Sequence, residues 1–202
     1  MLTRRSLMGS ATALALFMGI AAPAFADPDA ALAKLQETVL SKGPSGEDPS
    51  PASDVVLSDE ELAKIKEMGA TAAIVMHYGG NDWSQAQING LQTQFGAMGI
   101  EVIAVTDAGF KPEKQVSDLE TIMAQSPDII VSIPTDPTAT AAAYRAAHEA
   151  GAKLVFMDNV PAGFVAGQDY VSVVSADNYG NGVAAAHLMA KALGPDGGEI
   201  GL

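Results

Sequence analysis

The feature that most constrains the fold is a regular alternation of short apolar runs and amphipathic stretches that begins at Thr71. The apolar runs indicate strands, and the stretches between them, whose apolar residues recur three or four positions apart, indicate helices. This repeat predicts an α/β fold, a doubly wound parallel sheet whose strands are buried on both faces. The expected strands are 71–76, 100–106, 128–133, 152–157 and 170–174, and the expected helices are 83–98, 112–125, 137–150 and 179–193.

A separate helix is expected just before the repeat. Ser58 and Glu61 have the spacing of a capping box, and Gly69 is a suitable helix end. The residues before Ser58 contain a short helical pattern and then a Pro-, Gly- and Ser-rich stretch, which is typical of a linker or a surface arm without a part in a binding site. The expected segments are a signal peptide (1–26), an arm and linker (27–57) and the α/β region from residue 58 onward.

The first 26 residues have the features of an export signal. Arg4 and Arg5 precede an apolar run over 11–22, and Ala24-Phe25-Ala26 forms a small-x-small cleavage motif. Thr3 to Leu7 also resembles a twin-arginine signal, so the general secretory and twin-arginine routes both stay open. We expect cleavage and a periplasmic location. No later stretch is long and apolar enough to span a bilayer, so direct membrane insertion after cleavage is not expected.

Charge and composition exclude several classes of partner and site. The formal net charge is −13, and removal of Arg4 and Arg5 with the signal would leave 24 acidic and 9 basic side chains, a charge of −15. Such a surface repels nucleic acid and anionic membranes. The chain has no cysteine, and its three histidines lack metal-ligand spacing. We therefore expect no metal, no cofactor and no catalytic residues. The chain stops at Leu202 where another apolar strand begins, which predicts a truncated sequence.

The loop after the first strand carries the most informative candidate site residues. Ligands of doubly wound sheets bind outside the carboxyl ends of the strands, which selects the loops 77–84, 107–111, 134–137 and 158–163. The first of these contains Trp83, the only tryptophan, beside Asn81. An aromatic face next to amide and carboxylate groups suits a sugar, because the ring packs on C–H groups while the polar groups pair with hydroxyls. Alternatively, Trp83 anchors the following helix to the core.

Asp158 and Asn159 form the second informative pair, directly after a strand. A carboxylate there can accept hydrogen bonds from two neighbouring hydroxyls of a sugar. A turn or cap role is the alternative for Asp158. Asp136, which Pro137 follows, is expected to cap the helix that begins at Pro137.

One motif favours an enzyme instead. Residues 180–185 fit the pattern G-x-G-x-x-A of a dinucleotide-binding turn and follow an expected strand. This leaves an exported NAD(P)-dependent oxidoreductase as an alternative. The motif stands on the fifth βα unit and is separated from its strand by residues 175–179, and both features weaken the interpretation.

From about Ala70 to the end, the chain resembles the periplasmic sugar-binding proteins of the ribose-binding type. The resemblance rests on four stretches in register: AAIVMHYGGNDW, PDIIVSIPTD, AGAKLVFMDN and VSVVSADNYGNGVAAAHLMAKALG. It implies two Rossmann-like lobes that are joined by a hinge and close on a sugar, with residues 175–178 at the first crossover. The resemblance thus divides the chain into a first lobe (58–177) and the start of a second lobe (178–202).

The resemblance also implies a ligand-binding set. Asn81 would hydrogen-bond hydroxyls, Trp83 would form an aromatic wall and Asp158 would grip vicinal hydroxyls. The neighbouring pocket positions would hold His77, Ser84 and Asn159. The chain departs from the ribose binders where it has Ser84 for a second aromatic, Asn159 for an arginine and Ile133 for an asparagine.

These departures leave ribose, another small sugar or a polyol open as the ligand. The expected function is capture of the solute, without chemistry, for a membrane permease of an ABC importer. A periplasmic sensor that passes a sugar signal to a receptor is a further alternative.

Overall fold

The computed structural model describes residues 27–201, so the expected signal peptide lies outside the described residues. Five parallel strands form one sheet in the order β2-β1-β3-β4-β5. The predicted α/β class is confirmed. The strands are β1 (Thr71–Met76), β2 (Glu101–Asp107), β3 (Ile129–Ser132), β4 (Lys153–Met157) and β5 (Ser172–Val174).

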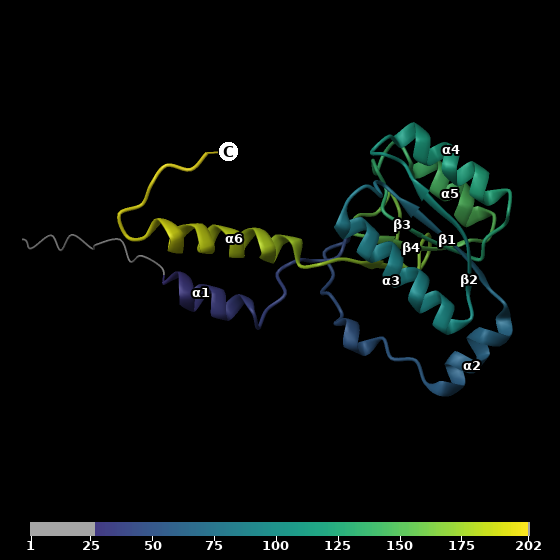
Figure 1. Cartoon of the computed structure of the whole chain (residues 1–202), viewed down its shortest axis with the longest axis horizontal. Coiled ribbons are helices and arrows are strands. Elements are labelled where there is room, and N and C mark those ends of the chain that lie inside the picture. Colours follow the sequence, from purple (N-terminus) through teal and green to yellow (C-terminus); the bar gives the residue numbers. More distant parts are fainter. Residues whose placement is uncertain (1–26, 202) are drawn as a thin grey trace, which may run out of the picture.

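Helices cover both faces of the sheet, as a doubly wound fold requires. Helices α4 and α5 pack on one face, and α3 packs on the other with α2 beside it (Figure 1). The helices are α1 (Pro28–Leu35), α2 (Asp59–Met68), α3 (Asp82–Met98), α4 (Pro112–Met123), α5 (Ala141–Glu149) and α6 (Asn178–Leu193), with a 3-10 helix η1 (Ala52–Asp54).

The core divides along the pleat of the strands. Successive residues of β1, such as Ile74 and Val75, belong to hydrophobic clusters on opposite faces of the sheet, because successive side chains of a strand point to opposite faces. The face under α4 and α5 contains Tyr144 edge-on to Phe156, with 5.2 Å between ring centroids. The Ser132 hydroxyl donates to the Val75 carbonyl at 2.7 Å and also meets the Tyr144 hydroxyl, so both buried hydroxyls are paired.

The prediction that every strand is buried on both faces is wrong for β2 and β5. Val105 on β2 is 42% exposed and Val174 on β5 is 61% exposed. Both strands lie at the edges of the sheet, where each has a neighbour on one side only. The inner strands β1, β3 and β4 are largely buried, as expected.

Side-chain caps start four of the six described α-helices, and α4 and α5 begin without one. Ser58 and Glu61 form the predicted capping box of α2, and Gly69 ends that helix in the left-handed conformation. Asp136 does not cap a helix that begins at Pro137. Its Oδ1 accepts the backbone N–H groups of Thr138 and Ala139, at 2.8 and 2.7 Å, and so closes a turn. Regular helix begins only at Ala141.

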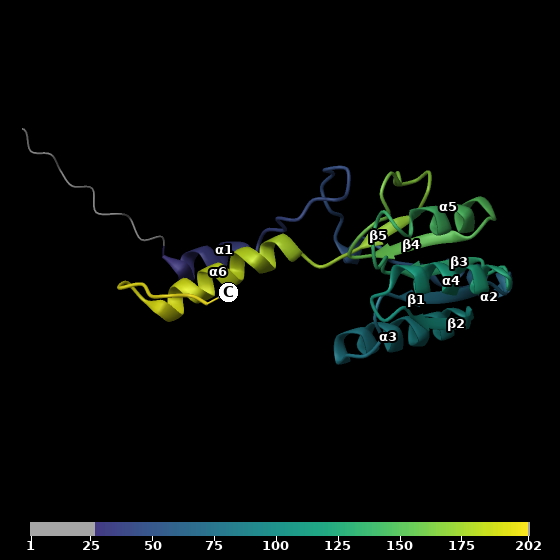
Figure 2. The same cartoon turned by 90° about the horizontal axis from the view of Figure 1, so that it is seen from above.

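The arm before α2 is attached to α6. Figures 1 and 2 show α1 lying along α6, away from the sheet, and a salt bridge joins Asp29 to Lys191 at 2.5 Å. Asp177, directly before α6, holds the next part of the arm. Its Oδ2 accepts the N–H of Leu40 at 2.8 Å, and its Oδ1 accepts the N–H groups of Ser41 and Gly180 at 2.8 and 2.9 Å. None of the helices within residues 27–201 is long and apolar enough to cross a membrane.

We expect Asp177→Asn to release the arm while α6 stays capped. The amide oxygen of asparagine can still accept from Ser41 and Gly180, but its NH2 group meets the Leu40 N–H as a second donor. Hydrogen exchange at Leu40 should accelerate severalfold, with little change at Gly180. Asp136→Asn is the matched control. One oxygen of Asp136 already accepts the N–H groups of both Thr138 and Ala139, and the amide oxygen of asparagine can replace it, so hydrogen exchange at these two residues should stay as in the parent. Unchanged exchange at Leu40 in Asp177→Asn would contradict this account.

The contact between Asp177 and the arm should contribute stability only over a defined pH range. The N–H of Leu40, with the Ser41 side chain and the Gly180 N–H, lowers the pKa of Asp177 to about 2 from 3.8. The carboxylate therefore contributes stability above a pH of about 4 and loses it as the pH falls through about 2. Leu40 exchange, corrected for its intrinsic pH dependence, should show this loss.

Candidate functional site

The candidate site lies where β1, β2, β3 and β4 end. Because β2 and β3 lie on opposite sides of β1, the strand order reverses at β1. The loops after β1 and β3 flank this switch point, where doubly wound sheets bind ligands. The described structure places five of the six predicted site residues on the surface or half-buried at this edge, namely His77, Asn81, Trp83, Asp158 and Asn159.

Asn81 is the N-cap of α3. Its Oδ1 accepts the backbone N–H of Ser84 at 2.8 Å, so the side-chain oxygen already has a partner. The exposed amide NH2 group is the part of Asn81 that can serve a ligand, as a donor.

Trp83 and Ser84 occupy different environments on the first turn of α3. Trp83 is 52% exposed, which does not fit an anchor in the core. Ser84 is fully buried, and its hydroxyl has no hydrogen-bond partner among the described residues. Ser84 therefore does not reach the surface of the edge as Trp83 does.

Four rings gather beside the end of β1. The His77 ring lies edge-on to Trp83 and to Phe110, with centroids 6.1 and 5.0 Å apart. Phe110 stacks on Tyr78 at 4.7 Å with an interplanar angle of 15°. A Cβ at Gly80 would clash with the Tyr78 ring, so glycine is required for that ring to lie over the backbone. These rings form an exposed aromatic surface.

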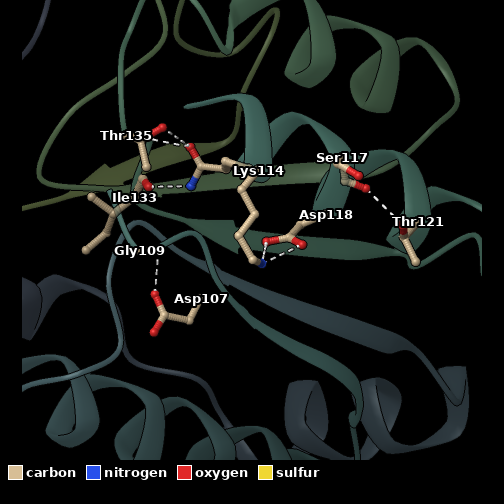
Figure 3. Close-up of polar contacts among 9 residues, drawn as sticks. Asp107, Gly109, Lys114, Ser117, Asp118, Thr121, Ile133 and Thr135 are labelled. Atoms are coloured by element: carbon tan, nitrogen blue, oxygen red, sulfur yellow. Dashed lines mark hydrogen bonds and ion pairs between the residues drawn. The ribbon is translucent and has the colours of Figure 1, made fainter. Parts of the chain in front are cut away.

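Two carboxylates from other strands face the same histidine. Burial lowers the pKa of His77 below 6.5, against the charges of Asp158 and Asp107, which raise it. Asp107, the last residue of β2, accepts the N–H of Gly109 at 2.8 Å (Figure 3), and a Cβ at Gly79 would lie 3.1 Å from its Oδ2. The His77 Nδ1 is buried and has no partner among the described residues.

Asp158 and Asn159 close the other side of the site. Asp158 has a left-handed backbone, with φ of 61°, and its Oδ1 accepts the Ser175 hydroxyl at 3.2 Å. Its other carboxylate oxygen accepts no hydrogen bond from a described residue, so it is available to a ligand. Asn159 donates from Nδ2 to the Pro134 carbonyl at 3.3 Å, which ties the β4 loop to the β3 loop.

A buried glutamine from α4 positions the β3 loop. Gln115 is fully buried, donates to the Ile133 carbonyl at 2.9 Å, and accepts the Thr135 N–H and hydroxyl at 2.8 and 2.9 Å. Figure 3 shows the three contacts at Ile133 and Thr135. The contact with Ile133 is buried and the two contacts with Thr135 are half-buried, so Gln115 holds the loop beside the switch point in place.

Sequence reasoning missed Tyr78, Asp107, Phe110 and Ser175. The loop 107–111 had been selected by its position after β2, but no rule of spacing distinguishes Phe110 within it. Phe110 is distinguished only by its conformation in the folded protein. Its φ is 59°, which costs a residue with a Cβ about 1–2 kcal/mol, and its side chain is 60% exposed. Within residues 27–201, no three His, Cys, Asp or Glu side chains lie close enough to hold a metal ion.

A hollow lies elsewhere, at the C-terminal end of α6. It has a volume of about 630 Å³, and Pro28, Leu193 and Pro195 are among its lining residues. It is open and contains none of the predicted site residues.

His77 should make stability depend on pH. Because its folded-state pKa is below 6.5, the unfolded chain binds a proton first as the pH falls. The folded state therefore keeps its full stability above a pH of about 6.5 and loses part of it below that value. We expect the free energy of unfolding, measured in urea between about pH 7.5 and 5, to depend less steeply on pH in His77→Gln than in the parent. His148 and His187 are present in both proteins, so their contribution cancels. An equal slope in the variant would contradict the prediction.

Comparisons with known proteins place this geometry in a family. A model described as a periplasmic binding protein domain matches residues 72–202, more than half of the chain. No match was found among curated proteins. Among solved structures, an ABC transporter solute binding protein from Mycobacterium smegmatis with bound glycerol is 24% identical, with a TM-score of 0.57 over 64% of this chain and 43% of that one.

Two further structures are similarly related. AraP, an arabinose binding protein from Geobacillus stearothermophilus, is 26% identical, with a TM-score of 0.53 over 61% of this chain and 41% of its own. An ABC transporter solute binding protein from Agrobacterium vitis, bound with alpha-D-tagatopyranose, is 25% identical, with a TM-score of 0.54 over 61% and 44%. The chain thus spans less than half the length of each of these structures. Since the family model covers the whole sheet from β1 onward, the chain belongs to the periplasmic binding protein domain family.

Proposed function

We propose that this protein is a periplasmic solute-binding protein of the ribose-binding type that captures a small sugar or polyol for an ABC importer. The observation that carries the proposal is the meeting of exposed rings and carboxylates beside the switch point. Trp83 and Phe110 offer apolar faces, while Asp158 offers an acceptor that no described residue uses. Sugars need both, because their C–H faces are apolar and their hydroxyls lose water on binding.

The proposed roles follow the contacts of each side chain. Trp83 would pack on the sugar ring, Asn81 would donate from its amide NH2 group, and Asp158 would accept from two vicinal hydroxyls. His77 and Asn159 would contact the ligand from neighbouring positions. Ser84 would line the wall behind Trp83, since it is buried.

The proposal includes two lobes. Residues 58–177 would form the first lobe, and α6, from Asn178, would begin the second, with residues 175–178 at the crossover. The projection of α6 away from the sheet supports this division (Figure 2). The arm 27–57 would precede the first lobe, after a signal peptide over 1–26 that sends the protein to the periplasm. Closure of the lobes on the solute would present a docking surface to the permease.

The dinucleotide-binding alternative is not favoured. Gly180 and Gly182 lie inside α6 and not in a turn before it. The Asp177 carboxylate also occupies the N-terminus of this helix, where it accepts the Gly180 N–H at 2.9 Å. A pyrophosphate would have to displace this negative charge from the N–H groups that it needs. The similar structures named above are described as solute-binding or arabinose-binding proteins.

The function is tested by calorimetry on the protein read in full from its gene, including any sequence after Leu202. D-ribose, D-arabinose, D-tagatose, allitol, glycerol and NADH form the panel. We expect at least one sugar or polyol to bind with micromolar affinity or better, and NADH not to bind. Saturable binding of NADH alone would contradict the proposal.

Asp158→Asn should weaken binding of the identified solute at least tenfold, which corresponds to about 1.4 kcal/mol. The change removes the charge that strengthens hydrogen bonds to hydroxyls, while asparagine also tolerates a left-handed backbone, so folding should be kept. Asp136→Asn, on the neighbouring loop, is the matched control because its carboxylate only closes a turn. Equal affinity in the parent and Asp158→Asn, with unchanged thermal melting, would show that Asp158 has a structural role.

Trp83→Ala should cost about 1–3 kcal/mol of binding free energy, because a packed aromatic face is lost. As Trp83 is the only tryptophan, solute addition should also change the emission of the parent protein. A folded Trp83→Ala variant with full affinity would remove Trp83 from the site.

A further inference from the structure

Phe110 combines two features that the fold does not require together. It is one of three non-glycine residues with positive φ among the described residues, and its side chain is 60% exposed. A residue with a Cβ is strained in the left-handed region, and an exposed aromatic side chain gains little from burial to offset that strain. Gly109, just before it, also has positive φ, of 57°, so the turn contains two successive left-handed residues.

A glycine at position 110 would serve the turn better. The contact that anchors the turn is the Phe110 N–H, which donates to the His77 carbonyl at 2.8 Å, and it involves backbone atoms only. Glycine would keep this hydrogen bond and adopt the same φ without strain. The benefit of phenylalanine must therefore come from its side chain.

The side chain is held in a fixed direction. One face of the Phe110 ring stacks on Tyr78 at 4.7 Å, and its contact with His77 is edge-on, with the ring planes at 74°. No other described ring stacks on the opposite face. His77 in turn contacts Trp83, so Phe110 and Trp83 flank the same histidine at the carboxyl edge of the sheet. Strained residues gather at functional sites, where surrounding contacts fix a side chain for a ligand.

We propose that Phe110 is a specificity-determining residue whose free ring face, together with Trp83, packs on the C–H face of a cyclic sugar. This rests on the proposed function and narrows its ligand from sugars and polyols to ring forms. A pyranose presents a flat, rigid C–H surface to an aromatic ring. An open-chain polyol has no such face and loses more torsional freedom when it is ordered. The aromatic surface therefore selects the ring.

The test uses pairs of a sugar and the polyol formed by its reduction: D-ribose and ribitol, D-arabinose and D-arabitol, D-allose and allitol. In the full-length protein, the parent should bind one sugar at least tenfold more tightly than its polyol. Phe110→Gly should weaken binding of that sugar at least tenfold and leave binding of the polyol unchanged, so the preference disappears. Its melting temperature should not fall, because glycine relieves the strained φ.

Ser126→Gly is the matched control. Ser126 also has positive φ, of 51°, but it lies before β3, at the opposite edge of the sheet from Phe110. Ser126→Gly should keep both the melting temperature and the preference for the sugar.

The outcomes separate the inference from the function on which it rests. A parent that binds a sugar, with equal affinity in Phe110→Gly, overturns the role of Phe110 and leaves the proposed function standing. A fall of several degrees in melting temperature with retained binding assigns Phe110 to stability instead, and a parent that prefers the polyol overturns the selection of rings. A parent that binds neither member of any pair, and neither D-tagatose nor glycerol, overturns both proposals.

Discussion

The site depends on β1 being hydrogen-bonded on both sides and buried on both faces. Parallel pairing with β2 on one side and β3 on the other places the reversal of strand order at β1. Ala72 to Met76 are completely buried, so the strand cannot shift without exposing apolar side chains on both faces. His77 is the first residue after this buried strand, and it is only half-buried. The rings and carboxylates of the site are arranged around it.

The edge of the sheet at this point carries features that stability alone would not favour. Phe110 and Asp158 both have left-handed backbones, and the buried His77 Nδ1 and Ser84 Oγ have no hydrogen-bond partners among the described residues. Unpaired buried polar atoms and strained residues each lower the stability of the folded state. The fully paired contacts of Gln115 and of Ser132 lie just behind this edge and hold the strands and loops in place. Such a combination of a strained surface on a well-paired support is typical of binding sites.

The segment between β5 and α6 contains a carboxylate with a different role. Asp177 caps α6 and at the same time accepts two N–H groups from the arm, more than a hundred residues earlier in the chain. One side chain thus joins the arm to the start of α6. The arm is tied again to the last turn of α6, through Asp29 and Lys191. Because the arm continues into α2 and the sheet, it forms a second connection between the sheet and α6, in addition to the segment after β5.

The sequence by itself determined the elements and their order. Apolar runs and helical periodicity placed β1 to β4 and α3 to α6 within a few residues, and the capping box at Ser58 was correct, because burial patterns and caps are local properties of the chain. The class of fold and the loops of the carboxyl edge followed from that order. The exposure of the edge strands was missed, since it depends on which strands have a neighbour on one side only. The start of α5 was missed because Asp136 closes a turn with Thr138 and Ala139 ahead of the helix.

Only the tertiary structure decided which loop residues meet. Asn81, Trp83 and Asp158 could be selected by residue type and position, but Phe110 could not, because its φ and its stacking on Tyr78 arise when β2 pairs with β1. The attachment of the arm to Asp177 could not be predicted either, because the Pro- and Gly-rich composition of the arm does not indicate what it contacts. Local sequence determines what each segment can form, whereas the contacts at the site join residues from different strands, and their geometry exists only after the sheet has assembled.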